Sequence, residues 1–145
     1  MASGPVGAAA LTTIHELASS RLADAPRMDV LGMRALRRFI PAFAHERPRS
    51  TRLRRWALAG DIVANAAYYA AIPGSTRPAT WTRAAALGAG AGIGALLLPA
   101  PMGLGDPPCA NRPRNQVMTV AWYLVGALAA AATANALGAT RRQFA

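Results

Sequence analysis

Three apolar runs, each long enough to cross a lipid bilayer, constrain this chain more than any other feature. They are Trp56–Ile72, Ala84–Pro101 and Val117–Gly138. A membrane helix needs roughly 20 mainly apolar residues to span about 30 Å of hydrocarbon. Three such runs leave little of a chain of 145 residues for a separate soluble domain. The sequence therefore predicts an all-α integral membrane protein, with residues 1–145 forming a single membrane domain.

Composition supports thin helices that pack closely. The chain is 53% hydrophobic but only 6% aromatic, so most of its apolar side chains are small. Small residues allow helix backbones to approach each other in lipid. Small side chains would provide too little volume for the hydrophobic core of an ordinary water-soluble protein.

A fourth apolar segment, residues 5–21, is weaker because it contains His15 and Glu16, which are costly in lipid. It does not resemble a secretory signal, since no basic residue precedes it. It either spans the membrane or lies half-buried at the interface, and we expect it to span. The predicted fold is a membrane four-helix bundle with three strong spans and this weaker one. The expected spans are residues 5–21, 53–72, 82–101 and 117–138.

Residues 26–40 have the pattern of an amphipathic helix, with Met28, Leu31 and Phe39 on one arc. Arginines occupy the opposite face: Arg34, Arg37 and Arg38. A basic face opposite an apolar face is typical of a helix that lies in the membrane interface. We therefore expect the arginines to bind anionic lipid headgroups. The alternative is that the apolar face packs on a soluble partner.

The distribution of charge predicts a topology. The net charge of +10 would suggest nucleic acid binding in a soluble protein. Ten of the 16 basic residues, however, lie within residues 21–55, beside an apolar run. With four spans, twelve arginines fall on one side of the membrane and four on the other. The positive-inside rule then places residues 21–55 in the cytoplasm and both termini outside, in a multi-pass inner-membrane protein that does not bind nucleic acid.

Polar residues at matched depth form the best candidate site. His15 lies six residues before Arg21, and Asp61 lies six residues after Arg55. At about 1.5 Å per residue, both would sit roughly 9 Å inside the same boundary. Antiparallel neighbouring helices would bring them into contact. The candidate intramembrane cluster consists of His15, Glu16, Asp61, Asn65, Tyr68 and Tyr69.

Ionisable groups within a membrane suggest a proton relay or a substrate site. The same cluster could instead form a paired network that fixes helix register, or supply a catalytic acid and base. The packing around Asp61 distinguishes these hypotheses: a dry, fully paired carboxylate favours a structural role. A water-filled cavity favours transport, and a lipid-sized cleft favours an enzyme.

Four glycines at helical spacing predict a surface for close helix crossing. They are Gly88, Gly90, Gly92 and Gly94, which give two overlapping GxxxG patterns. The same run matches a loose dinucleotide-binding pattern, but no strand precedes it. His15 and Glu16 begin like the HExxH metalloprotease motif, but Ser19 stands where the second histidine is needed. His15, His45 and Cys109, the sole cysteine, do not have the spacing of metal ligands, so we expect no metal site. We also expect no cofactor.

Three stretches resemble segments of small multi-pass bacterial membrane proteins of uncharacterised function. They are APRMDVLGMRAL at residues 25–36, MGLGDPP at residues 102–108 and MTVAWYLVGALAA at residues 118–130. Together they cover about a quarter of the chain. The resemblance implies a single four-helix unit and carries no activity.

The leading functional hypothesis is therefore an interaction or accessory subunit of the inner membrane. It is motivated by the GxxxG surface and by the lack of a catalytic motif, and it implies a homo-oligomer or a membrane-protein partner. One alternative is a small transporter or channel that uses the polar cluster. A second is a membrane-embedded enzyme that uses the same residues, although the sequence favours a chain that is not an enzyme.

Overall fold

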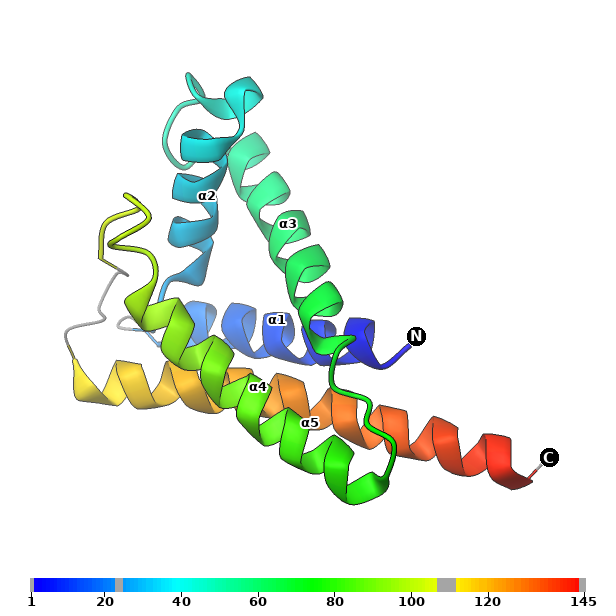
Figure 1. Cartoon of the computed structure of the whole chain (residues 1–145). Coiled ribbons are helices and arrows are strands. Elements are labelled where there is room, and N and C mark those ends of the chain that lie inside the picture. Colours follow the sequence, from blue (N-terminus) through cyan, green and yellow to red (C-terminus); the bar gives the residue numbers. More distant parts are fainter. Residues whose placement is uncertain (1, 23–24, 107–111, 144–145) are drawn as a thin grey trace.

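The computed structural model describes residues 2–22, 25–106 and 112–143, and in this part of the chain all regular structure is helical. Figure 1 shows the arrangement. The elements are α1 (Ser3–Arg21), α2 (Met28–Phe39), the 3₁₀ turn η1 (Pro41–Phe43), α3 (Thr51–Tyr69), α4 (Arg77–Leu97) and α5 (Pro113–Gln143). The predicted all-α class is confirmed.

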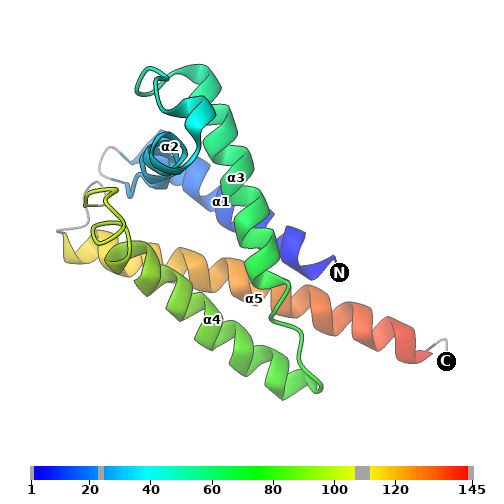
Figure 2. The same cartoon turned by 45° about the horizontal axis from the view of Figure 1, so that its top comes forward.

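Helix α5 is the axis of the fold, and α1 and α4 pack along it in the antiparallel sense (Figures 1 and 2). Helix α3 packs on α1, and α2 lies against α3. The α1–α3 pair is also antiparallel, because Glu16 near the end of α1 meets Arg54 near the start of α3. This arrangement brings the C-terminal end of α1 close to α2 and to the first half of α3.

Side-chain caps explain why α3 and α4 begin earlier than the expected residues 53 and 82. The Ser50 hydroxyl accepts a hydrogen bond from the Leu53 amide at 3.2 Å, and the Thr76 hydroxyl accepts one from Ala79 at 3.2 Å. Such caps satisfy amides that have no partner within the helix. Helix α4 ends at Leu97 and not at residue 101, because Pro99 and Pro101 follow it and the residue before a proline disfavours the helical conformation.

The remaining ends also differ from expectation. Helix α2 begins at Met28, two residues after the expected start. Helix α5 extends beyond both ends of residues 117–138.

The apolar face of α2 packs on α3 of the same chain: Gly32 lies against Ala57, and Met33 is buried.

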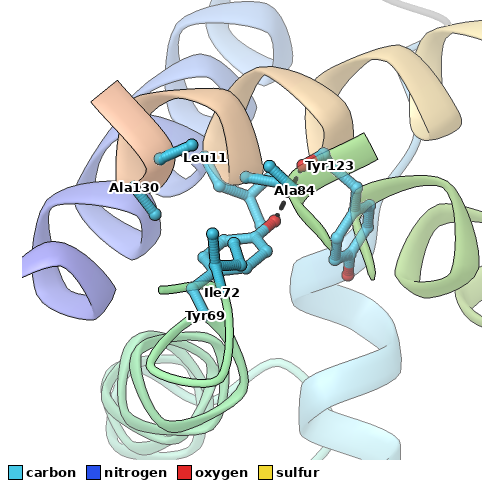
Figure 3. Close-up of a cluster of buried hydrophobic side chains, with 8 residues drawn as sticks. Leu11, Tyr69, Ile72, Ala84, Tyr123 and Ala130 are labelled. Atoms are coloured by element: carbon cyan, nitrogen blue, oxygen red, sulfur yellow. Dashed lines mark hydrogen bonds between the residues drawn. The ribbon is translucent and has the colours of Figure 1, made fainter. Parts of the chain in front are cut away.

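Two small clusters of buried apolar side chains hold the helices together. The larger joins α1, α4, α5 and the end of α3 (Figure 3). Within it the Tyr69 hydroxyl donates a hydrogen bond to the Tyr123 carbonyl at 2.9 Å. The smaller joins α2, η1 and the start of α3 through Met33, Phe43 and Leu53. Alanines make up much of the larger cluster, which is how thin helices approach closely.

One described helix is long and apolar enough to cross a membrane: residues Pro113–Gly138 of α5. The expected strong spans at residues 53–72 and 82–101 are not confirmed by length and composition. Helix α3 carries Arg52, Arg54, Arg55 and Asp61 among its 19 residues. Helix α4 carries Arg77 and Arg83 together with many glycines. Membrane association thus has the support of a single helix, and four spans are not established.

Candidate functional site

A small polar cavity lies where α1, α2 and α3 meet. Its volume is about 30 Å³. The lining residues are Thr12, His15, Glu16, Met28, Asp29, Arg54, Ala57, Leu58 and Asp61. A water molecule needs roughly 10–15 Å³ of such space and two to four polar partners. This cavity therefore has the size and polarity to hold about two water molecules.

Two residues of α1 that line this cavity each carry a buried polar atom. The Thr12 hydroxyl and the His15 Nε2 atom have no hydrogen-bond partner among the described residues. The His15 ring packs edge-on against Trp122 and Tyr123, with ring centroids 5.2 Å and 5.9 Å apart. Buried polar groups are nearly always hydrogen-bonded in folded proteins, so two such atoms in residues beside one cavity are unusual.

Two of the three carboxylates around the cavity are paired with arginine. Glu16 accepts a hydrogen bond from Arg54 at 3.1 Å, across the α1–α3 contact. Asp29 accepts two from Arg27, at 2.9 Å and 2.8 Å. The hydrogen bonds from Arg27 hold the pKa of Asp29 below its usual value. Both of these acids are therefore charge-compensated by the chain itself.

The third carboxylate, Asp61, has a neutral partner instead. The Asn65 side-chain amide donates to Asp61 Oδ1 and to the Asp61 carbonyl, each at 2.9 Å. Asn65 is buried, and Asp61 is half-buried. None of the ion pairs between described residues includes Asp61. Asp61 is thus oriented by an amide, and no cationic side chain within the described part of the chain pairs with it.

A second, larger cavity opens on the other side of Asp61. Its volume is about 350 Å³, within the range of roughly 300–1,000 Å³ that is usual for small-molecule sites. Its lining is Met28, Leu31, Gly32, Ala35, Leu36, Ala57, Gly60, Asp61, Ala64, Ala95, Pro99, Leu104 and Tyr123. Asp61 is the one carboxylate in this otherwise largely apolar lining, and it belongs to both cavities.

Sequence reasoning missed the larger cavity, although α3 carries a signal for it. Ala57, Gly60, Asp61 and Ala64 recur at helical spacing, so they share one face. Three of these side chains are too small to fill the space between α2 and α3. A stripe of small residues around one acid is the pattern that could have indicated a cavity.

The predicted contact between α1 and α3 polar residues forms only in part. His15, Glu16 and Asp61 line one cavity, but no hydrogen bond between described residues joins His15 or Glu16 to Asp61 or Asn65. The reason is that each of the acids has another partner on α3. Asp61 accepts from Asn65 within its own helix, and Glu16 pairs with Arg54, about two turns earlier on α3.

The two tyrosines of the predicted cluster serve other contacts. The Tyr68 hydroxyl donates to the Leu87 carbonyl of α4 at 3.1 Å. The Tyr69 hydroxyl donates to the Tyr123 carbonyl of α5, and Tyr69 is fully buried. Both therefore tie α3 to its neighbours, and neither lines the cavities around Asp61.

The four glycines divide between two environments. A Cβ atom added at Gly88 would lie 2.8 Å from Ala127 Cβ, and one added at Gly92 would lie 2.6 Å from Val120 Cα. Gly88 and Gly92 thus permit the close approach of α4 to α5. Gly90 and Gly94 meet neither α1 nor α5 within 4 Å, so half of the GxxxG surface is used inside this chain.

The three arginines of α2 are all exposed, but one of them has partners within the chain. Arg34 Nη1 donates to the carbonyls of Leu104 at 3.0 Å and Asp106 at 2.9 Å. These carbonyls belong to a loop in which Gly103 and Gly105 have φ angles of 74° and 72°, a conformation that favours glycine. Arg34 therefore fastens the loop after α4 to α2, beside the larger cavity. Headgroup binding by Arg34, Arg37 and Arg38 stays a prediction.

No group of three or more histidine, cysteine, aspartate or glutamate side chains converges as a metal site within the described residues. Cys109 lies outside those residues. No protein-family model, curated protein or solved structure matches this chain. Any assignment of function therefore depends on the geometry around Asp61.

Proposed function

We propose that this chain is a small multi-pass protein of the bacterial inner membrane that moves protons and a small solute through the cavities at Asp61. The observation that carries the proposal is the position of Asp61, whose side chain lines both the polar cavity and the larger apolar one. In this proposal residues 21–55 face the cytoplasm, where their arginines meet anionic headgroups.

The exposure of α5 supports membrane insertion. Only 33% of its most apolar window is buried inside the protein, whereas the core helix of a soluble protein is mostly buried. Val117 is 69% exposed on α5, Val63 is 68% exposed on α3, and Leu97 is 67% exposed on α4. Large apolar surface of this kind is typical of contact with lipid or with a partner protein.

We infer further spans beside α5 from the lengths of the helices that pack along it. Helix α1 has 19 residues and α4 has 21, which correspond to lengths of about 28 Å and 32 Å. These lengths match the roughly 30 Å of hydrocarbon in a bilayer. Helices that lie alongside a membrane-spanning α5 would occupy the same layer. Burial of His15 lowers the cost of placing its imidazole there, and the Glu16–Arg54 pair lies near the ends of α1 and α3 that meet the cytoplasmic boundary, where water reaches it.

Proton movement is supported by the groups around the polar cavity. Thr12, His15 and Asp61 all line a space of water size, with the Thr12 hydroxyl and the His15 Nε2 atom buried beside it. Hydroxyl, imidazole and carboxyl groups can pass protons between themselves and ordered water. The chain thus offers a route by which a proton could reach Asp61 from the side of α1.

The other hypotheses have less support. The accessory-subunit hypothesis rests on the GxxxG surface, of which Gly88 and Gly92 are covered by α5 of the same chain and only Gly90 and Gly94 are left for a partner. A purely structural role would require a paired Asp61 in a dry contact, whereas Asp61 borders two cavities and lacks a cationic partner. The apolar cavity at Asp61 would also suit an enzyme, but Asp61 is the one carboxylate among its described lining residues and has no histidine or second carboxylate beside it there.

The test is proton flux into liposomes that contain the purified protein and a trapped pH-sensitive dye. The wild type should dissipate an imposed pH gradient faster than the Asp61→Asn variant, which keeps the oxygen that accepts from Asn65. Asp106→Asn is the matched control, because it removes one carboxylate outside both cavities. Equal flux in the wild type and in Asp61→Asn, with both proteins folded, would refute the proposed function.

A further inference from the structure

We propose that the larger cavity binds a lipophilic cation, namely an amine or a quaternary ammonium compound with an apolar body, with its charge against Asp61. This inference rests on the proposed function and names the class of solute. It comes from the combination of an apolar cavity of about 350 Å³ with a single carboxylate that the chain does not neutralise.

The charges that face Asp61 from the packed helices favour a cation from outside the chain. On α1, Glu16 is paired with Arg54 of α3, and on α2, Asp29 is paired with Arg27. No arginine is among the described residues that line the larger cavity. A carboxylate taken from water without a counter-ion is costly, and a bound ammonium group would supply that counter-ion.

The rest of the lining suits the apolar body of such a molecule. Helices α2 and α3 contribute small or aliphatic side chains, and α4 contributes Ala95 near its end. Tyr123 of α5 lines the same cavity and offers an aromatic ring. Aromatic faces attract cations, and the attraction is stronger where water is excluded. Burial of the apolar body adds a favourable term that grows with the area removed from water.

The test uses benzyltrimethylammonium as the probe and N,N-dimethylbenzylamine N-oxide as an analogue of similar shape without net charge. Binding of each to the full-length protein in maltoside micelles is measured by isothermal titration calorimetry. The wild type should bind the cation more tightly than the N-oxide by about tenfold or more, as expected for a cation paired with a partly buried carboxylate. Asp61→Asn should abolish this preference, and Asp106→Asn should preserve it.

A second variant tests the location. A Cβ atom at Gly60 meets no other atom within 4 Å, so Gly60→Leu can place its side chain in the cavity without disturbing the helix. It should weaken binding of both compounds. Equal affinity of the wild type for the two compounds, or no binding of either, would overturn the cation proposal. If Gly60→Leu binds the two compounds as tightly as the wild type, the compounds do not bind in the larger cavity. Loss of proton flux in Asp61→Asn remains a separate measurement, so a transporter of another solute would still be recognised.

Discussion

The contact between α4 and α5 can be tested with two alanine substitutions that differ only in their surroundings. A Cβ atom at Gly92 would lie 2.6 Å from the backbone Cα of Val120, closer than two carbon atoms can approach. A Cβ atom at Gly90 would find one neighbour within 4 Å, the Tyr68 hydroxyl at 3.8 Å. Gly92→Ala must therefore push two helices apart, and Gly90→Ala must not.

The expected magnitudes follow from two opposing terms. Replacing glycine by alanine inside a helix stabilises it by about 1 kcal/mol, and this gain applies to both sites. Overpacking of a close contact typically costs roughly 1–3 kcal/mol, and this cost applies to Gly92 alone. The free energies of unfolding of the two variants should thus differ by about 1–3 kcal/mol, with Gly90→Ala the more stable.

The assay is unfolding of the purified protein in mixed micelles by increasing fractions of SDS, followed by circular dichroism. Gly88→Ala provides a second test, since its Cβ would lie 2.8 Å from Ala127 Cβ. It should behave like Gly92→Ala. If all three variants shift the unfolding midpoint equally, the packing of α4 on α5 described above is wrong.

Three further predictions concern charge and placement. The Glu16–Arg54 pair is half-exposed, so a double-mutant cycle with Glu16→Gln and Arg54→Gln should give a coupling below about 1 kcal/mol that decreases with salt; a larger coupling at high salt would contradict this exposure. Because Arg27 lowers the pKa of Asp29, the stability that this carboxylate adds should be complete above its unfolded value of 3.8 and lost as the pH falls through its lower folded value. Unfolding measured against pH should show this loss in the wild type and not in Asp29→Asn. Alkaline carbonate should leave the protein in the membrane pellet, and its release would refute the proposed insertion.

Local signals in the sequence account for most of the helices but not for their ends. The apolar runs predicted the existence of α3, α4 and α5 because periodicity and length are local properties. The starts of α3 and α4 lie before the expected residues 53 and 82, because basic and polar residues that precede an apolar run carry no hydropathy signal for a helix. Ser50 and Thr76 were the available signals, since serine and threonine are favoured helix caps.

The candidate site was harder to predict because its contacts join distant parts of the chain. Equal depth in the membrane predicts that His15, Glu16 and Asp61 lie close together, and they do line one cavity. The depth of a residue does not determine the direction of its side chain. The contact of His15 with Trp122 and the bonds from Arg34 to the loop at residues 104 and 106 have no local signature. The larger cavity depends on space that small residues leave open, and this requires the relative positions of three helices.

The most direct test of the central claim is the sidedness of two loops that flank α3. Arg47 precedes this helix and Ser75 follows it, and both are exposed. Each is replaced by cysteine in a cysteine-free background and treated with a membrane-impermeant thiol reagent in intact spheroplasts. A membrane-spanning α3 predicts that Ser75→Cys is labelled at once and that Arg47→Cys is labelled only after permeabilisation. Labelling of both variants, or of neither, in intact spheroplasts would show that α3 does not cross the membrane and would contradict the proposed transport site.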